Sequence, residues 1–405
     1  MSARIVHGYT GLFFCAILAF LSGTGTLSVF SVELDWLMRA EMRVAADGNK
    51  APVGQSLDAA LAAAAGVRPI ALMRFPGARF ADRVLVASDD AGRRFVWVDP
   101  YSGQVRGTTP TATLKETLRE LHRGLSTKAR LVQVAVAALS LPLALSVISG
   151  LVLYRRFWTG FFRMPRRTGS RRALLSDLHR LTAVWSLPFL AIVVITSAVF
   201  LSEMVGFGPP MRPMPRPDPI RAEALPPGFG GADLDRAVAQ AAALIPDFQL
   251  TDVQFPTSGN APLTIRGTDG TLLVRSDSSV VHLDPVRTMT QGSGSDSAAA
   301  GVFAVQPAAA MGPRLRVFEA VRVVHYGTLA GLPTRILWSV FGLGLMALGV
   351  LGALICAERL RKEFQVRGRI ARSGLRHVLS GPGIGNWPGI LTIAVAIALA
   401  VRAFV

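Results

Sequence analysis

The sequence predicts an α-helical membrane protein with four core transmembrane helices, a fifth C-terminal helix, and two small α+β domains outside the membrane. Hydrophobic residues make up 51 % of the 405 residues and charged residues only 17 %, whereas about a quarter of the residues in ordinary soluble proteins are charged. Five apolar stretches, separated by two long polar segments, give the order of the elements. The composition also excludes intrinsic disorder, and a total of two cysteines excludes a disulfide scaffold and a four-cysteine metal site.

The apolar stretches are the candidate transmembrane helices. They are residues 8–32, 131–154, 181–203, 336–357 and 387–405. A helix needs about 20 apolar residues to cross the hydrocarbon core of a bilayer, and the first four stretches meet this length. The fifth is shorter in its purely apolar part. The first is too long for the hydrophobic region of a signal peptide, so we expect it to be a retained span.

Arginine-rich segments between the spans predict the direction of each span. Segment 155–172 carries seven arginines and no acidic residue, and segment 358–377 carries seven basic residues. Such segments stay on the cytoplasmic side of a membrane. The N-terminus is therefore predicted to be cytoplasmic, and residues 33–127 and 204–324 to lie outside. Membrane orientation alone explains the net charge of +17, so we expect no nucleic-acid partner.

Each outside segment is long enough for a small domain of its own. The first is predicted to contain an alanine-rich helix that begins at Ser56, with this serine as the N-cap, and strands at 69–75, 82–88 and 93–98. The second is predicted to contain a helix from Ala232 and strands at 250–256, 262–267, 271–275 and 280–283. The last strand of each ends in Asp-Pro, a dipeptide typical of turns.

The order span, outside domain, span therefore occurs twice, and the chain is predicted to be an internal duplication. Both copies begin in the cytoplasm, so they are parallel repeats related by an axis along the membrane normal. The predicted segments are 1–32 (first helix), 33–127 (first outside domain), 128–154 (second helix), 155–178 (basic loop), 179–203 (third helix), 204–324 (proline-rich linker and second outside domain), 325–357 (fourth helix with its preceding segment), 358–385 (basic loop) and 386–405 (fifth helix).

Four of the six histidines occupy equivalent places in the two repeats. His7 and His179 precede the first and third spans, and His122 and His325 lie about ten residues before the second and fourth spans. The topology puts the first two on the cytoplasmic side and the other two on the outer side. Symmetric helices would then present two imidazoles to a shared axis at each depth, which is the arrangement of a haem iron with two axial histidines.

Two alternatives remain for these histidines. They can be ordinary interfacial residues, or zinc ligands, although two histidines at each depth leave a zinc ion short of ligands. No Cys-x-x-Cys-His motif occurs, so any haem would be non-covalent and b-type. His282 and His377 are interpreted as ordinary residues, and Cys15 and Cys356 as small packing residues inside the spans.

Several motifs resemble those of the PepSY-associated transmembrane proteins, an iron-regulated inner-membrane family that includes siderophore reductases. The motifs are Ser22-Gly-Thr-Gly-Thr-Leu-Ser-Val-Phe30, Val98-Asp-Pro-Tyr-Ser-Gly103, Leu121-His-Arg123, Asp177-Leu-His-Arg-Leu181 and Val324-His-Tyr-Gly327. The resemblance covers residues 4–362. It implies two periplasmic PepSY domains on a multi-pass protein of the bacterial inner membrane. It also implies b-type haem held through His7, His122, His179 and His325.

The leading functional hypothesis is an inner-membrane electron conduit with two b-type haems that acts as a ferric-siderophore reductase. Quinol or a cytoplasmic reductase would donate the electron, and a periplasmic ferric chelate would accept it. Five basic residues are near enough in sequence to pair with haem propionates, namely Arg4, Lys128, Arg130, Arg180 and Arg335. Two other functions fit the same sequence: a non-enzymatic membrane protein that regulates a periplasmic peptidase, and an uptake permease for a metal chelate.

Overall fold

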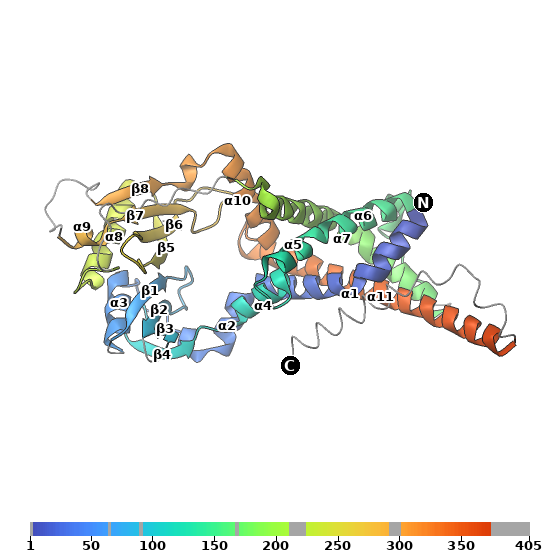
Figure 1. Cartoon of the computed structure of the whole chain (residues 1–405), viewed down its shortest axis with the longest axis horizontal. Helices are drawn as coiled ribbons and strands as arrows, with labels where there is room; N and C mark the ends of the chain where they lie inside the picture. The colour runs from blue at the N-terminus through green and yellow to red at the C-terminus, as the bar shows by residue number, and fades with distance from the viewer. Residues whose placement is uncertain are drawn as a thin grey trace. The chain divides into compact units, whose positions relative to one another are not determined.

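A computed structural model of the chain describes residues 3–63, 66–88, 92–166, 170–209, 224–290 and 301–373. The chain forms two compact units, and each is built from segments that are far apart in the sequence. The helical unit contains Met1–Ser31, Lys115–Gly208 and Val324–Val405, and the sheet unit contains Val32–Leu114 and Pro209–Val323. Figure 1 shows their elements in chain order by colour.

Apolar helices make up the helical unit. They are α1 (Ala3–Val29), α5 (Arg130–Ala138), α6 (Ser140–Leu153), α7 (Arg171–Ser202) and α11 (Leu332–Ser373). Within the described residues, three segments are long and apolar enough to cross a membrane, namely Arg130–Leu153, Arg171–Phe207 and Leu332–Arg359. A fourth span exists if the two parts of α1, Ile5–Gly11 and Phe13–Val29, which meet at a 52° bend, count as one. The predicted fifth span at 387–405 lies outside the described residues.

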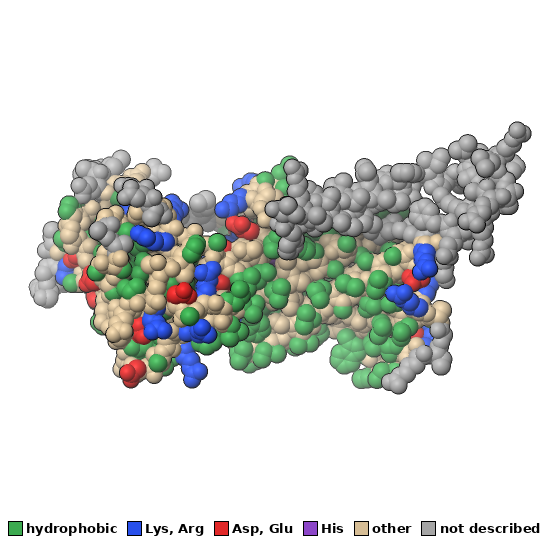
Figure 2. Space-filling model, turned by 90° about the horizontal axis from the view of Figure 1, so that it is seen from below, with side chains coloured by type: hydrophobic (Ala, Val, Ile, Leu, Met, Phe, Trp, Pro, Cys, Tyr) green, Lys and Arg blue, Asp and Glu red, His purple; other side chains and the backbone are tan. Residues whose placement is uncertain are grey.

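The helices of this unit pack closely because small residues line their contacts. Helix α11 packs on both α1 and α7, and α6 also packs on both. A Cβ atom on Gly349 of α11 would come within 2.9 Å of the backbone oxygen of Cys15 on α1, so only glycine allows this approach. Apolar side chains such as Leu141, Ile195 and Val340 point outward, and Figure 2 shows how they cover the helices. Such an apolar outer surface is suited to contact with lipid.

Eight antiparallel strands form one continuous sheet in the sheet unit. The strands are β1 (Arg68–Met73), β2 (Asp82–Ser88), β3 (Gly92–Val98), β4 (Val105–Pro110), β5 (Gln249–Gln254), β6 (Leu263–Thr268), β7 (Ser279–Leu283) and β8 (Val302–Gln306). Their order is β4-β3-β2-β1-β5-β6-β7-β8, and Leu72 of β1 pairs with Val253 of β5. Each outside segment therefore supplies four strands, and the two halves join at β1 and β5.

The core of the sheet unit lies between the sheet and two helices, α3 (Val53–Ala62) and α8 (Gly231–Leu244). Both helices bury alanines and leucines, among them Leu57 and Leu234, which are fully buried. Several strands add fully buried side chains, and Val84 of β2 and Ile265 of β6 belong to the same core. Figure 1 shows α3 and α8 next to each other beside the strands.

Helices α3 and α8 cross at two glycines and cap each other. The backbone N–H of Gly54 in α3 donates to Asp235 of α8 (2.7 Å), and the N–H of Gly231 in α8 donates to Asp58 of α3 (2.6 Å). A Cβ on either glycine would overlap the carbonyl oxygen of the other. This exchange of aspartates repeats the same interaction in both halves of the duplication and satisfies N–H groups that a helix leaves open at its N-terminus.

Three local predictions are wrong. The helix that contains Ser56 begins at Val53 after Pro52, because Asp235 from the other helix provides the capping oxygen, so Ser56 is no N-cap. Residues 271–275 form turns instead of a strand, since Leu273 takes a positive φ of 62° after the Asp269-Gly270 turn. The second Asp-Pro motif opens a short helix, α9 (Pro285–Thr290), as proline at a first helical position allows.

We predict that Asp82 is essential for the stability of the sheet unit. Its carboxylate is fully buried and accepts hydrogen bonds from Ser56 (2.8 Å) and from Nη2 of Arg74 (2.6 Å). Asp82→Ala leaves the Arg74 charge without its partner, which we expect to cost about 3–5 kcal/mol. Thermal unfolding of the full chain in detergent measures the loss. The exposed Asp47→Ala change is the control and should unfold with the wild type; equal melting of both variants would contradict the prediction.

Candidate functional site

The structure brings the four histidines together as two pairs within the helical unit. His7 of α1 faces His179 of α7, with ring centroids 6.4 Å apart. His122 of α4 (Leu114–Gly124) faces His325 of α10 (Pro313–Tyr326), again with centroids 6.4 Å apart. Each pair takes one histidine from each repeat. The pairing expected from the sequence is therefore present in the fold, while the ligand that the pairs hold stays a prediction.

The spacing of the rings fits one metal ion between two imidazoles. An imidazole nitrogen binds a metal at about 2.0 Å, and a five-membered ring with bonds of about 1.33 Å has a radius of about 1.1 Å. Two imidazoles on opposite sides of one ion therefore have centroids about 6.2 Å apart, close to the 6.4 Å of both pairs. The interplanar angles of 73° and 48° are both compatible, because each ring can turn about its own bond to the metal.

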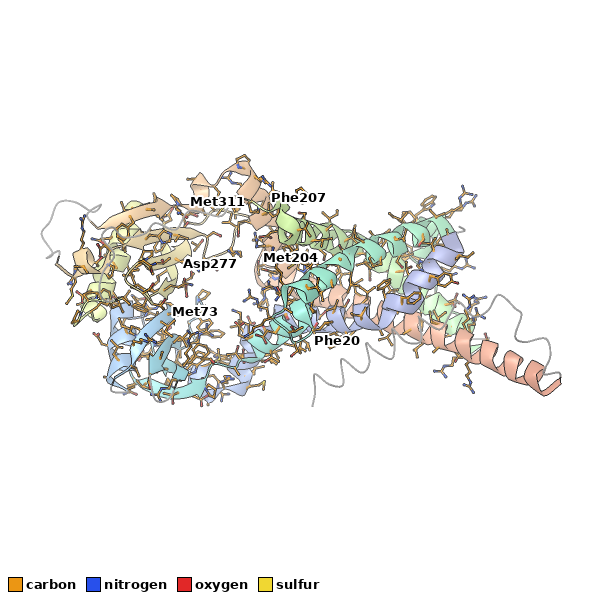
Figure 3. All side chains as sticks on the ribbon, in the orientation of Figure 1. Phe20, Met73, Met204, Phe207, Asp277 and Met311 are labelled. Carbon is orange, nitrogen blue, oxygen red and sulfur yellow. The ribbon has the colours of Figure 1, made fainter. Side chains whose placement is uncertain are left out.

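We call His122 and His325 the outer pair, and His7 and His179 the inner pair. Backbone and hydroxyl groups of the first span in each repeat contact the outer pair. Nδ1 of His122 donates to the carbonyl oxygen of Leu21 (2.9 Å) and lies 3.4 Å from Thr24 Oγ1. Nδ1 of His325 lies 2.8 Å from Thr196 Oγ1, whose own proton goes to the carbonyl of Ile192. When the Thr196 hydroxyl donates to Ile192, it accepts from Nδ1–H of His325. Figure 3 labels Phe20 on α1, and Thr24 follows it by four residues, about one helical turn.

A glycine leaves space for one ring of the outer pair, and an aromatic side chain packs against the other. A Cβ on Gly25 would come within 2.8 Å of Cε1 of His122, so any larger residue would displace the ring. The ring of Phe200 packs edge-on against His325 with centroids 4.9 Å apart. These contacts restrict the rotation of both imidazoles, which helps to preorganise a ligand pair.

The inner pair is held by the second span of each repeat. Nδ1 of His7 donates to the carbonyl oxygen of Ser146 on α6 (3.0 Å). Nδ1 of His179 is buried without a well-formed hydrogen bond, and the backbone of Leu348 on α11 is its weak partner. Four residues after each of these backbone groups comes a glycine, Gly150 or Gly352, whose missing side chain leaves space for the ring. The two repeats thus support their histidines in the same way.

The hydrogen bonds determine where the free lone pairs lie. A carbonyl oxygen only accepts, so Nδ1 carries the proton in His7 and His122, and the Thr196 hydroxyl implies the same for His325. This tautomer leaves a lone pair on Nε2, for which the described residues provide no hydrogen-bond donor. Histidines that bind metals characteristically donate their other ring N–H to a carbonyl or hydroxyl in this manner.

Electrostatics keep the outer imidazoles neutral. Burial lowers the pKa of His122 and of His325, and the neighbouring His122 lowers the pKa of His325 further. Both are therefore uncharged near pH 7, the state in which imidazole binds a metal. In the part of the chain that the structure describes, no group of three His, Cys, Asp or Glu side chains could hold a metal ion. Each pair thus offers two histidine side chains.

The basic residues expected near propionates have protein partners. Arg180 pairs with Asp177 (2.9 Å), Arg130 donates to the backbone of Met204 (2.8 Å), and Arg335 donates to the backbone of Val29 (2.6 Å). Lys128 pairs with Glu120, and the side chain of Arg4 lies outside the described residues. Their role toward propionates stays a prediction. His282 is buried in β7 against Thr264, and His377 lies outside the described residues.

Sequence reasoning missed the groups that support the histidines. Thr24 and Thr196 each follow the first histidine of their repeat by seventeen residues, and the structure shows that they contact the second histidine of the same repeat. The seventeen-residue spacing can be seen in the sequence. That these threonines contact the second histidine depends on how α1 packs against α4 and how α7 packs against α10. Gly150 and Gly352 likewise occupy similar positions in the second spans of the two repeats.

We predict that Thr196 tunes ligand binding at the outer pair. Thr196→Val keeps the shape of the side chain and removes the hydroxyl beside Nδ1 of His325. If this pair holds the haem that the sequence predicts, haem affinity should fall about 10- to 100-fold. Haem titration of the purified protein, followed by absorbance, measures the change. Ser202→Ala is the control, because Ser202 bonds to its own helix. Unchanged affinity in Thr196→Val would contradict the supporting role.

Comparison with known proteins identifies the family. The family model described as the PepSY-associated TM region matches residues 4–359, which is most of the chain and includes all four paired histidines. This confirms the resemblance seen in the sequence motifs. Comparison with curated proteins gives no match. The chain therefore belongs to the family of membrane proteins with a PepSY-associated TM region.

Proposed function

We propose that the helical unit is a transmembrane electron conduit that binds one b-type haem between His7 and His179 and another between His122 and His325. The observation that carries the proposal is the pair of equal centroid distances, 6.4 Å at both levels, between imidazoles from equivalent positions of the two repeats. Ordinary interfacial histidines have no reason to meet twice at this spacing. Zinc would need further ligands, which the described residues do not supply.

The residues of the chain have separate tasks in this proposal. When bound, haem supplies iron that can take up and release one electron at a time. His7, His122, His179 and His325 would be its axial ligands. The backbone oxygens of Ser146 and Leu21 and the Thr196 hydroxyl hold Nδ1–H and so increase the basicity of the ligands.

Helix geometry supports two levels on opposite sides of a membrane. His7 and Thr24, which contacts His122, are seventeen residues apart on α1. At about 1.5 Å per residue they are separated by at most about 25 Å along the helix, and the 52° bend shortens this distance. The hydrocarbon core of a bilayer is about 30 Å thick. One histidine pair thus lies toward each membrane face.

The proposed reaction is reduction of a periplasmic ferric chelate, such as a siderophore. The arginine-rich segment 155–172 adjoins the inner pair along the chain and favours a cytoplasmic location for it. An electron from quinol or a cytoplasmic reductase would enter there and leave at the outer pair. Chelators with hard oxygen donors hold Fe(III) much more tightly than Fe(II), so reduction releases the metal. The sheet unit would hold the chelate on the periplasmic side.

Vesicles that contain the full chain test this function. Dithionite is enclosed inside, and a ferric hydroxamate with a chromophore specific for Fe(II) is supplied outside. We expect Fe(II) to form only in vesicles with protein, and the His122→Ala and His179→Ala variants to fall to the protein-free background. An equal rate in the wild type and in both variants would contradict electron transfer through the pairs. Two bound haems without any Fe(II) formation would exclude the ferric chelate as acceptor.

A further inference from the structure

The only two cysteines of the sequence lie at one helix contact, the contact between α1 and α11. Cys15 is buried on α1, and Cys356 is partly buried on α11. They are far apart in the sequence and belong to different repeats. Two thiols placed at one contact by two distant segments can react with each other, so their chemistry needs an explanation beyond packing.

The contact is unusually close because α11 presents glycines to α1. A Cβ on Gly349 would lie 2.9 Å from the Cys15 carbonyl oxygen, and a Cβ on Gly352 would lie 2.6 Å from Cys15 Sγ. Cys356 follows Gly352 by four residues and Gly349 by seven, so all three occupy one face of α11. Cys356 therefore lies on the face of α11 that Cys15 contacts.

Helix direction brings the two sulfur atoms together. Thr26 packs on Gly342 and Gly8 lies near Arg359, so α1 and α11 run antiparallel. Side chains in an α-helix tilt toward the N-terminus of their own helix. Cys15 therefore leans toward Gly11, whose Cβ position is 3.7 Å from the sulfur, while Cys356 leans toward Gly352. The two side chains therefore lean toward each other across the contact between α1 and α11.

The thiol pair also adjoins the inner histidine pair. The Cβ position of Gly352 that is 2.6 Å from Cys15 Sγ is 3.6 Å from Cε1 of His179. Any change at the thiols is thus transmitted to α1, which carries His7, and to the part of α11 that packs on His179. The thiol contact can therefore influence the inner pair through packing alone.

We propose that Cys15 and Cys356 form a reversible disulfide that links α1 to α11, with a membrane quinone as the oxidant. Two S–H bonds break and one S–S bond forms; the two electrons and two protons that are released convert the quinone to a quinol. Burial within apolar spans favours a lipid-soluble oxidant over a water-soluble disulfide, since exchange requires access to the attacked sulfur. Neither cysteine is part of a disulfide in the structure.

A count of free thiols tests the proposal. Membranes that contain the full chain are treated with a fully substituted benzoquinone, which cannot add thiols to its ring. They are then denatured, and free thiols are labelled with a maleimide polymer. The wild type should lose both labels together, and dithiothreitol should restore both. The variants Cys15→Ala and Cys356→Ala are matched controls that should each keep their one label. The linked form should also melt at a temperature higher by about 5 °C or more.

The outcomes separate this proposal from the haem hypothesis, because neither measurement uses haem. Retention of both labels in the wild type after treatment with the quinone and after treatment with oxidised glutathione would overturn the disulfide. Loss of the single label in either variant would also overturn it, since each thiol would then be oxidised independently. If oxidised glutathione removes both labels and the quinone removes neither, the assignment of a quinone oxidant is wrong.

Discussion

Replacing His179 or His325 with alanine should reduce haem content from about two per chain to about one. Each variant removes one ligand of one pair and leaves the other pair untouched, because His179 and His325 belong to different levels. An imidazole without a partner holds haem weakly, and loss of an axial ligand changes the coordination of the iron. Haem content of the purified variants, together with absorption spectra of oxidised and reduced protein, measures the effect.

The matched control for these variants is His282→Asn. His282 is buried in β7 of the sheet unit and contacts Thr264 through Nδ1 (3.1 Å), a contact that the asparagine side chain can replace. We expect this variant to keep two haems. Loss of both haems from His179→Ala, in a chain that still folds like the wild type, would mean that the levels are not independent. Full retention in either alanine variant would remove that histidine from the ligand set.

Gly231→Val should cause a large loss of stability in the sheet unit. A Cβ at this position overlaps the carbonyl oxygen of Gly54 and crowds the Asp58 carboxylate, so α3 and α8 cannot keep their crossing. The clash destabilises the sheet unit, and so does the loss of the hydrogen bond from the Gly231 N–H to Asp58. We expect the variant to be less stable by at least about 3 kcal/mol.

Hydrogen–deuterium exchange of the full chain localises this effect. Amides of β1 and β5, which pair at the centre of the sheet, should exchange faster in Gly231→Val than in the wild type. Gly312→Ala is the control, because its Cβ would meet no atom within 4 Å and its φ is not positive. Equal exchange in the two variants would show that the crossing contributes little to stability.

The histidine pairs could be predicted from the sequence because they depend on two simple patterns. The positive-inside rule assigns a side to each histidine, and the duplication makes His7 equivalent to His179 and His122 equivalent to His325. Neither pattern requires knowledge of packing. The groups that orient the rings do require it. Leu21 and Ser146 contribute backbone oxygens, which any residue carries, so no side-chain signal marks them.

The single sheet was not predictable from strand patterns. The two outside segments were expected to form separate domains, but β1 and β5, the first strands of the two halves, pair with each other. This pairing depends on the crossing of α3 and α8, where Gly54 and Gly231 allow backbone contact. Strands β4 and β8 were also missed. β4 contains glycine and threonines in place of an apolar alternation, since it is an edge strand with much of its surface exposed.

The central claim is that each histidine pair holds one haem. Its most direct test is the haem content of the purified wild-type chain in detergent, measured after expression with added haem and combined with a reductive titration. We expect about two non-covalent b-type haems per chain, both six-coordinate. No haem would contradict the account and leave the four histidines a structural role, as in a membrane protein that regulates a periplasmic peptidase.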